Sequence, residues 1–148
     1  WFGATSIGLR SIRRECYSPF RTMPPAVQSL DHVGIHVSDV ATSESFYRTV
    51  LGLEPLERPD LGFPGAWLRI GKAQELHLIG KNSCPGNPPS ERHFAMAIED
   101  ADSWATHLVK HRIQIDGPRQ RPDGALQIFL RDPDGHVIEL LARPAQAD

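Results

Sequence analysis

The chain has 148 residues, a formal net charge of −2, and 40% hydrophobic and 23% charged residues. These values are typical of a single globular domain, long enough to bury a core without disulfides as staples. No stretch approaches the roughly 18 consecutive apolar residues of a membrane span, and the near-neutral charge gives no electrostatic reason to expect a nucleic-acid partner.

The first 27 residues differ from the rest of the chain. They contain four arginines and several serines, but Glu15 is their one acidic residue. This composition is typical of a transit segment for a mitochondrion or plastid, and an upstream extension with Met23 as the true start is an equal alternative. Cys16 and Cys84 form no CxxC pair, which favours a reducing compartment. We expect a cytoplasmic protein unless residues 1–27 are a transit segment.

One sequence pattern occurs twice in the body of the chain. The segments DHVGIHVSD at 31–39 and RHFAMAIED at 92–100 both alternate like a strand and end in an aspartate. A helical pattern follows each aspartate, and we expect helices over 40–51 and 101–111. A repeat of about 60 residues indicates two copies of one small module rather than a solenoid.

Three short strand patterns follow each expected helix. They cover 54–58, 66–70 and 75–79 in the first copy, and 113–116, 126–130 and 137–141 in the second. The segment Asp132-Pro133-Asp134-Gly135 predicts a hairpin turn. The sequence therefore predicts an α+β fold of two tandem βαβββ modules in one domain over 28–146. Module one covers 29–81, a linker rich in proline covers 82–90, and module two covers 91–142.

Strand alternation predicts which face of each module carries chemistry. Successive side chains of a strand point to opposite faces, so His32 shares a face with Gly34 and His36. In the second copy, His93 shares a face with Ala95 and Ala97, and the bulky apolar side chains lie opposite. Small residues beside a histidine leave room for a ligand, although a strand histidine is more often a half-buried residue with local partners.

The last strand of each module repeats this arrangement. His77 lies between two leucines in the first copy, and Glu139 lies between Ile138 and Leu140 in the second. A carboxylate in such an apolar run is costly unless it is paired or bound to a metal. If the modules pack around a pseudo-twofold axis, His32, His77, His93 and Glu139 converge on one point. Three imidazoles and a carboxylate suit Zn, Fe, Ni or Co better than Mg or Ca.

The sequence resembles the vicinal oxygen chelate superfamily, which includes glyoxalase I, bleomycin-resistance proteins, extradiol dioxygenases and fosfomycin-resistance thiol transferases. The motifs that carry the resemblance are LDHVGIHVSD at 30–39, SFYRTVLGLE at 45–54, ELHLIG at 75–80, RHFAMAIED at 92–100 and FLRDPDGHVIELL at 129–141. The resemblance implies that the two modules form a curved, incomplete mixed sheet around a divalent metal ion, which would be Zn, Ni, Co, Mn or Fe. It places His32, His77, His93 and Glu139 at the ligand positions.

Position 77 departs from the pattern of glyoxalase I, which usually has glutamate there and moves its substrate proton with paired glutamates. With His77 in that place, Glu139 is the remaining catalytic base. Without His77, the set of His32, His93 and Glu139 resembles the dioxygenases and the thiol transferases. Extradiol dioxygenases are usually longer chains, and the thiol transferases usually extend further beyond the last strand.

The resemblance implies a metal-dependent lyase or isomerase like glyoxalase I, which acts on a small substrate that chelates the metal through neighbouring oxygens. The metal would act as a Lewis acid while Glu139 moves a proton. The alternatives are an iron-dependent extradiol-type dioxygenase and a metal-free binding protein like the bleomycin-resistance members. Family members commonly dimerise, some by placing modules of different chains together, and exposed sheet edges need cover. We therefore expect a homodimer.

Several further side chains are expected to line the substrate pocket. Trp67 and Phe129 would form walls, Arg69 would hold an anion or pair with a local acid, and Gln127 would face the metal. Arg119 lies in the loop expected before the strand at 126–130 and would cap an anionic substrate. Core packing for the two aromatic residues and a solvated loop for Arg119 are the alternatives.

Overall fold

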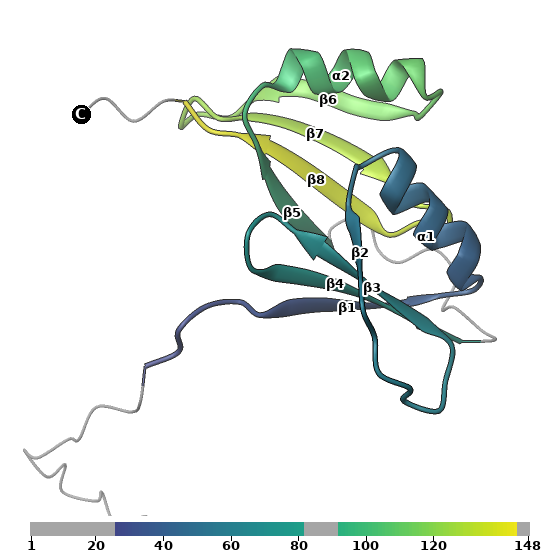
Figure 1. Cartoon of the computed structure of the whole chain (residues 1–148). Coiled ribbons are helices and arrows are strands. Elements are labelled where there is room, and N and C mark those ends of the chain that lie inside the picture. The colour runs from purple at the N-terminus through teal and green to yellow at the C-terminus, as the bar shows by residue number, and fades with distance from the viewer. Residues whose placement is uncertain (1–25, 82–91, 145–148) are drawn as a thin grey trace, which may run out of the picture.

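The computed structural model describes residues 26–81 and 92–144, in which each module has one helix and four strands (Figure 1). Module one contains β1 (His32–Val37), α1 (Val40–Thr49), β2 (Glu54–Leu56), β3 (Gly65–Ile70) and β4 (Gln74–Gly80). Module two contains β5 (His93–Ile98), α2 (Ala101–Lys110), β6 (Ile115–Gln120), β7 (Leu126–Arg131) and β8 (Val137–Ala142). This order confirms the α+β fold of two βαβββ modules. The expected linker at 82–90 and nearly all of the expected extension at 1–27 lie outside the described residues.

Each module forms a mixed four-stranded sheet, and the two sheets have the same design. The strand orders are β1-β4-β3-β2 and β5-β8-β7-β6, with one parallel pair in each sheet, β1 with β4 and β5 with β8. Gly34 lies opposite His77 in the first parallel pair, and Ala95 lies opposite Glu139 in the second. The repeat predicted from the sequence therefore extends to the register of individual residues.

Both helices begin at an aspartate, as predicted. The side chains of Asp39 and Asp100 accept hydrogen bonds of 2.7 Å from the backbone N–H groups of Thr42 and Ser103. These hydrogen bonds lower the pKa of both carboxyl groups. The helices end at Thr49 and Lys110, slightly before the expected ends.

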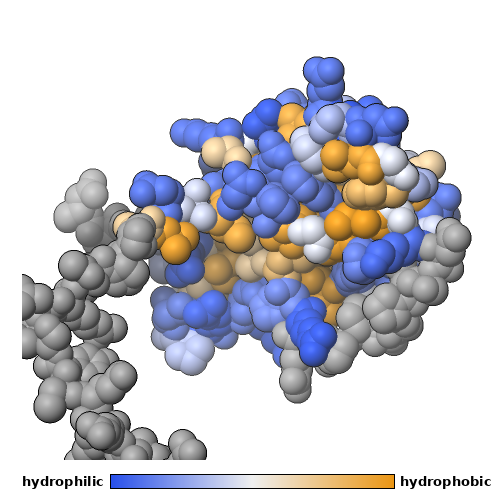
Figure 2. All heavy atoms as spheres, turned by 90° about the horizontal axis from the view of Figure 1, so that it is seen from below, coloured by the Kyte–Doolittle hydropathy of each residue, from blue (hydrophilic) through white to orange (hydrophobic). Residues whose placement is uncertain are grey.

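One cluster of buried apolar side chains runs through both modules. α1 packs on β3 and β4, and α2 packs on β6, β7 and β8. Seen from below, the surface has an apolar band between two hydrophilic margins (Figure 2). Neither helix in the described ranges is long and apolar enough to cross a membrane.

The hairpin turn between β7 and β8 joins the two modules. Asp132 accepts a hydrogen bond of 2.8 Å from the hydroxyl of the fully buried Tyr47 in α1. Asp134 accepts a hydrogen bond of 3.0 Å from the backbone N–H of Ser38, which lies between β1 and α1. The turn therefore fixes module two against the start of the helix of module one.

Candidate functional site

The histidine-bearing face of each first strand lies where alternation places it. In β1 the side chains of Ile35 and Val37 are buried, whereas His32 is exposed. In β5 the side chain of Met96 is buried and His93 is exposed. Each module therefore turns its bulky residues to the core and its histidine to the opposite face, as predicted.

Module two carries a carboxylate beside a histidine. Glu139 is only 4% exposed, and its Oε2 lies 2.9 Å from Nε2 of His93. Its Oε1 accepts a hydrogen bond of 2.6 Å from Nε2 of Gln127. The ring of Phe129 meets His93 edge to face, with 5.7 Å between the centroids. His93, Gln127, Phe129 and Glu139 form what we call the β8 half-site.

Module one carries a stack of three aromatic rings. The ring of His77 lies between His32, at a centroid distance of 4.2 Å, and Trp67, at 4.4 Å, with interplanar angles of 14° and 9°. Nε2 of His77 makes a hydrogen bond of 2.8 Å to Oε2 of Glu75, and Nδ1 of His32 makes one of 2.8 Å to Asp31. His32, Trp67, Glu75 and His77 form the β4 half-site.

Within one chain, the four expected metal ligands lie as two pairs. His32 stacks on His77 in the β4 half-site, and His93 contacts Glu139 in the β8 half-site. Among residues 26–81 and 92–144, no three or more histidine, cysteine or acidic side chains form a group that could hold a metal ion. The assignment of all four residues to one ion remains a prediction.

A cavity of about 250 Å³ joins the two modules beside His32. Its walls include His32 and Glu75 from module one and Ala95 and Ala97 from β5. The small side chains of β5 therefore lie beside the histidine of module one, His32, whereas the alternation pattern predicted open space beside His93. The wall from module one mixes polar and apolar side chains, and the wall from β5 is apolar.

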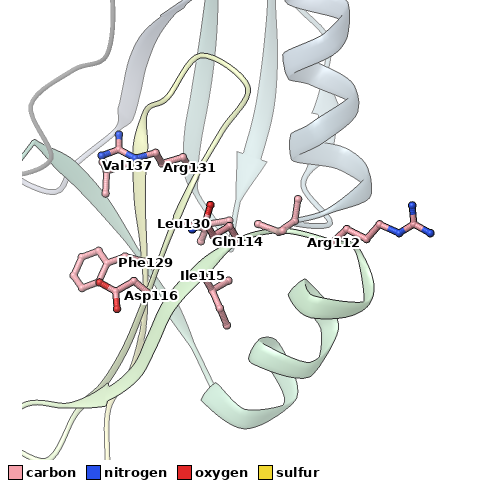
Figure 3. A pocket seen from close by; sticks show the side chains of 9 residues that line it. Arg112, Gln114, Ile115, Asp116, Phe129, Leu130, Arg131 and Val137 are labelled. Carbon is pink, nitrogen blue, oxygen red and sulfur yellow. The ribbon is translucent and has the colours of Figure 1, made fainter.

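A larger cavity of about 500 Å³ lies beside Phe129, against β6, β7 and the start of β8 (Figure 3). Phe129 and Asp116 are partners in the β6–β7 register, and Figure 3 shows their side chains together, away from Arg112. Phe129 also contacts His93, so this cavity adjoins the β8 half-site. Its volume lies in the range of small-molecule sites.

The expected position of Arg119 in a loop is wrong. β6 continues to Gln120, and Arg119 lies within it, opposite Gln127, and pairs with Asp116. Gly117 and Pro118 lie at a shift of register inside the strand, between Asp116 and Arg119. The charge of Arg119 is therefore balanced by a neighbouring carboxylate. Arg69, in contrast, lies in β3 as expected, opposite both Glu54 and Glu75.

Sequence reasoning missed Glu75, although a usable signal was present. Glu75 lies two residues before His77 and therefore on the same face of β4. Two other histidines, one in α2 and one in the hairpin between β7 and β8, contact module one. Nε2 of His107 contacts the carbonyl oxygen of Val50 at 2.8 Å, and Nε2 of His136 contacts that of His36 at 2.7 Å.

The sequence matches a known protein family, and the structure is similar to several solved structures. Residues 29–140 match the family model described as Glyoxalase/Bleomycin resistance protein/Dioxygenase superfamily. Metallothiol transferase FosB of Staphylococcus epidermidis is 32% identical over 120 residues, which cover 77% of this chain and 81% of the relative. A glyoxalase family protein of Bacillus anthracis superposes with a TM-score of 0.73 at 24% identity, covering 82% of this chain and 100% of the other. Lactoylglutathione lyase of Agrobacterium tumefaciens superposes with a TM-score of 0.63 at 25% identity, covering 81% and 96%.

Proposed function

This chain belongs to the glyoxalase/bleomycin resistance protein/dioxygenase superfamily, and we propose that it is a metal-dependent enzyme whose small substrate binds the metal through neighbouring oxygens. The ion would be divalent, one of Zn, Ni, Co, Mn or Fe, with His32, His93 and Glu139 as ligands. The observation that supports this proposal most directly is the buried carboxylate of Glu139 beside the imidazole of His93. A buried carboxylate is costly unless a cation or strong donors balance its charge.

The donor atoms fit such an ion. His32 uses Nδ1 for its hydrogen bond to Asp31, which leaves Nε2 to bind a metal; carboxylate–histidine–metal arrangements of this kind are common. The 2.9 Å between Oε2 of Glu139 and Nε2 of His93 brings two further donors together. Imidazole and carboxylate ligands suit the first-row divalent metals named above.

The proposal includes a homodimer in which the β4 half-site of one chain meets the β8 half-site of another. The two pairs of candidate ligands lie apart within a single chain, among the residues described. Leu61 and Phe63, in the loop between β2 and β3, are 47% and 41% exposed, and β2 and β6 are open sheet edges. Exposed apolar side chains and unpaired edges are features that a second chain would cover.

The side chains have distinct roles in this proposal. A bound divalent ion would supply Lewis-acid polarisation of the substrate oxygens. Gln127 holds Oε1 of Glu139. Oε2, the oxygen beside His93, would serve as the metal ligand and, when it is not bound to the ion, as the base that moves the substrate proton. Phe129 and Trp67 would wall the pocket and exclude water.

The first activity we propose is isomerisation of an adduct between an α-oxoaldehyde and a thiol, with one proton moved by Glu139. The likeness to lactoylglutathione lyase supports this choice. A second candidate is metal-dependent transfer of a thiol to an electrophile. Position 77, the register equivalent of Glu139, holds a histidine bound to Glu75 rather than a second metal-facing carboxylate. The relative named metallothiol transferase supports this candidate.

The test is turnover by the protein loaded separately with each of the five metals. The substrates are an α-oxoaldehyde–thiol adduct, a thiol together with an epoxide, and a catechol. We expect isomerisation of the adduct, and we expect Glu139→Gln to lower it by about 100-fold or more because the base is lost. Glu99→Gln, at an exposed position after β5, is the matched control and should retain activity.

Other results of the same turnover test would each favour one of the rival functions. Turnover of the thiol and epoxide alone would select the transferase, and ring cleavage with iron alone would select a dioxygenase. Absence of turnover with every metal, combined with tight binding of a small ligand by the metal-free protein, would overturn the proposal in favour of a binding protein.

A further inference from the structure

The ring stack of the β4 half-site points to a role for His77 other than metal binding. We infer that His77 is a positioning residue, which holds the ring of His32 in place for the metal and is not itself a ligand. This inference rests on the metal-dependent function proposed above. It makes His32 the one ligand that module one supplies.

His77 is held on both faces and at its edge. Trp67, its register partner in β3, stacks at 4.4 Å on one face, and His32 stacks at 4.2 Å on the other. Glu75 makes a hydrogen bond of 2.8 Å to Nε2. The side chain of His77 is only 15% exposed. A ring fixed in this way is a rigid surface against which another ring can rest.

The neighbouring strand lets His32 reach this surface. Gly34 is the register partner of His77 in β1 and has no side chain above the sheet. His32, two residues earlier on the same face, is the diagonal neighbour of His77 and can lean over this gap. The stack and the hydrogen bond from Nδ1 to Asp31 together set the direction of Nε2 of His32.

The hydrogen bond to Glu75 holds the ring of His77 in the stack. An N–H at Nε2 of His77 donates to the carboxylate of Glu75, so the edge of the ring is fixed while its faces contact His32 and Trp67. His32 binds its carboxylate partner through Nδ1 and keeps Nε2 for another. Residues that orient a metal ligand typically change metal affinity 10–100-fold when they are removed.

Two substitutions separate positioning from ligation. His77→Phe keeps a flat ring in the stack and removes both nitrogens, whereas His77→Ala removes the ring. We expect His77→Phe to bind Co²⁺ and Zn²⁺ within a few-fold of the wild type, with an unchanged Co²⁺ absorption spectrum. We expect His77→Ala to bind about tenfold more weakly. His93→Ala provides the reference for loss of a ligand, and the melting temperature checks that each variant is folded.

A second readout is independent of metal binding. In the metal-free protein, the imidazole NMR signals of His32 should shift in His77→Ala and stay in place in His77→Phe. The inference is wrong if His77→Phe loses metal as His93→Ala does, or changes the Co²⁺ spectrum. It is also wrong if His77→Ala leaves the His32 signals in place. A wild type that binds no metal would contradict the proposed function, while the NMR comparison would still decide whether His77 positions His32.

Discussion

The two carboxylate oxygens of Glu139 have different partners. Oε1 accepts the short hydrogen bond of 2.6 Å from Gln127, and Oε2 lies 2.9 Å from Nε2 of His93. A charge-assisted hydrogen bond of this kind is stronger than a neutral one. It fixes the orientation of the carboxylate, so that the second oxygen faces the side of the sheet where His93 lies.

Removal of the Gln127 amide should therefore destabilise the protein. Gln127→Leu preserves size but leaves one oxygen of a buried carboxylate without its donor. We expect the free energy of unfolding of the metal-free protein to fall by about 1.5–3 kcal/mol, as measured by urea denaturation. Gln114→Leu, at an exposed position before β6, is the control. Equal stability of the two variants would mean that the hydrogen bond to Glu139 contributes nothing.

At the scale of elements, the β7–β8 turn joins the second sheet to the first helix. The carboxyl group of Asp132 is buried at this junction, and burial raises its pKa. The hydrogen bond from Tyr47 opposes this effect because it stabilises the charged carboxylate. The hydroxyl of Tyr47 has its own pKa raised by burial and by the charge of Asp132, so it stays a donor.

Loss of the Tyr47 hydroxyl should have a pH-dependent cost. In Tyr47→Phe the charged Asp132 lacks its donor, and we expect a loss of about 1–3 kcal/mol in the free energy of unfolding near neutral pH. Because the pKa of Asp132 is raised on folding, its protonation favours the folded state at low pH, and that contribution disappears as pH rises through the folded pKa. The cost of the substitution should therefore shrink on acidification. Urea denaturation over a pH series measures it, and a cost independent of pH would contradict this account.

The elements show which parts of this fold were predictable from the sequence. The two modules were predictable because alternation, capping aspartates and the offset between 31–39 and 92–100 are local patterns. The turn at Asp132 was also predictable as a hairpin. Its contacts with Tyr47 and Ser38 were not, because they depend on how one module packs on the other.

Part of the geometry around the candidate site was predictable. Alternation placed His32 and His77 on one face of the first sheet and His93 and Glu139 on one face of the second, and each pair is in contact. The roles of these residues, and of Gln127 and Phe129, in binding a metal or a substrate stay predictions. The stack of His32, His77 and Trp67 was not predictable, because ring contacts depend on side-chain rotamers and on the gap at Gly34. The error at Arg119 arose because a Gly-Pro pair usually ends a strand, whereas tertiary pairing with β7 continues it here.

The whole molecule is built from two modules, each of which carries one half-site. The β4 half-site supplies His32, and the β8 half-site supplies its repeat equivalent His93 together with Glu139, in two sheets of the same strand order. The apolar band in Figure 2 lies between hydrophilic margins, as expected for a surface that meets another chain. A symmetric dimer that joins unlike half-sites would form two equal metal centres.

The most direct test is the metal content of a mixed dimer. His32→Ala and Glu139→Gln chains are produced together with two different peptide tags that do not bind metal, and the heterodimer is purified through both. Each variant alone should bind little metal, because both of its centres lack a ligand. The heterodimer should bind about one ion per two chains, since one centre combines the intact His32 of one chain with the intact Glu139 of the other. A heterodimer as poor in metal as its parents would contradict the proposed metal centre shared between two chains, and full metal content in either variant alone would contradict the proposed ligands.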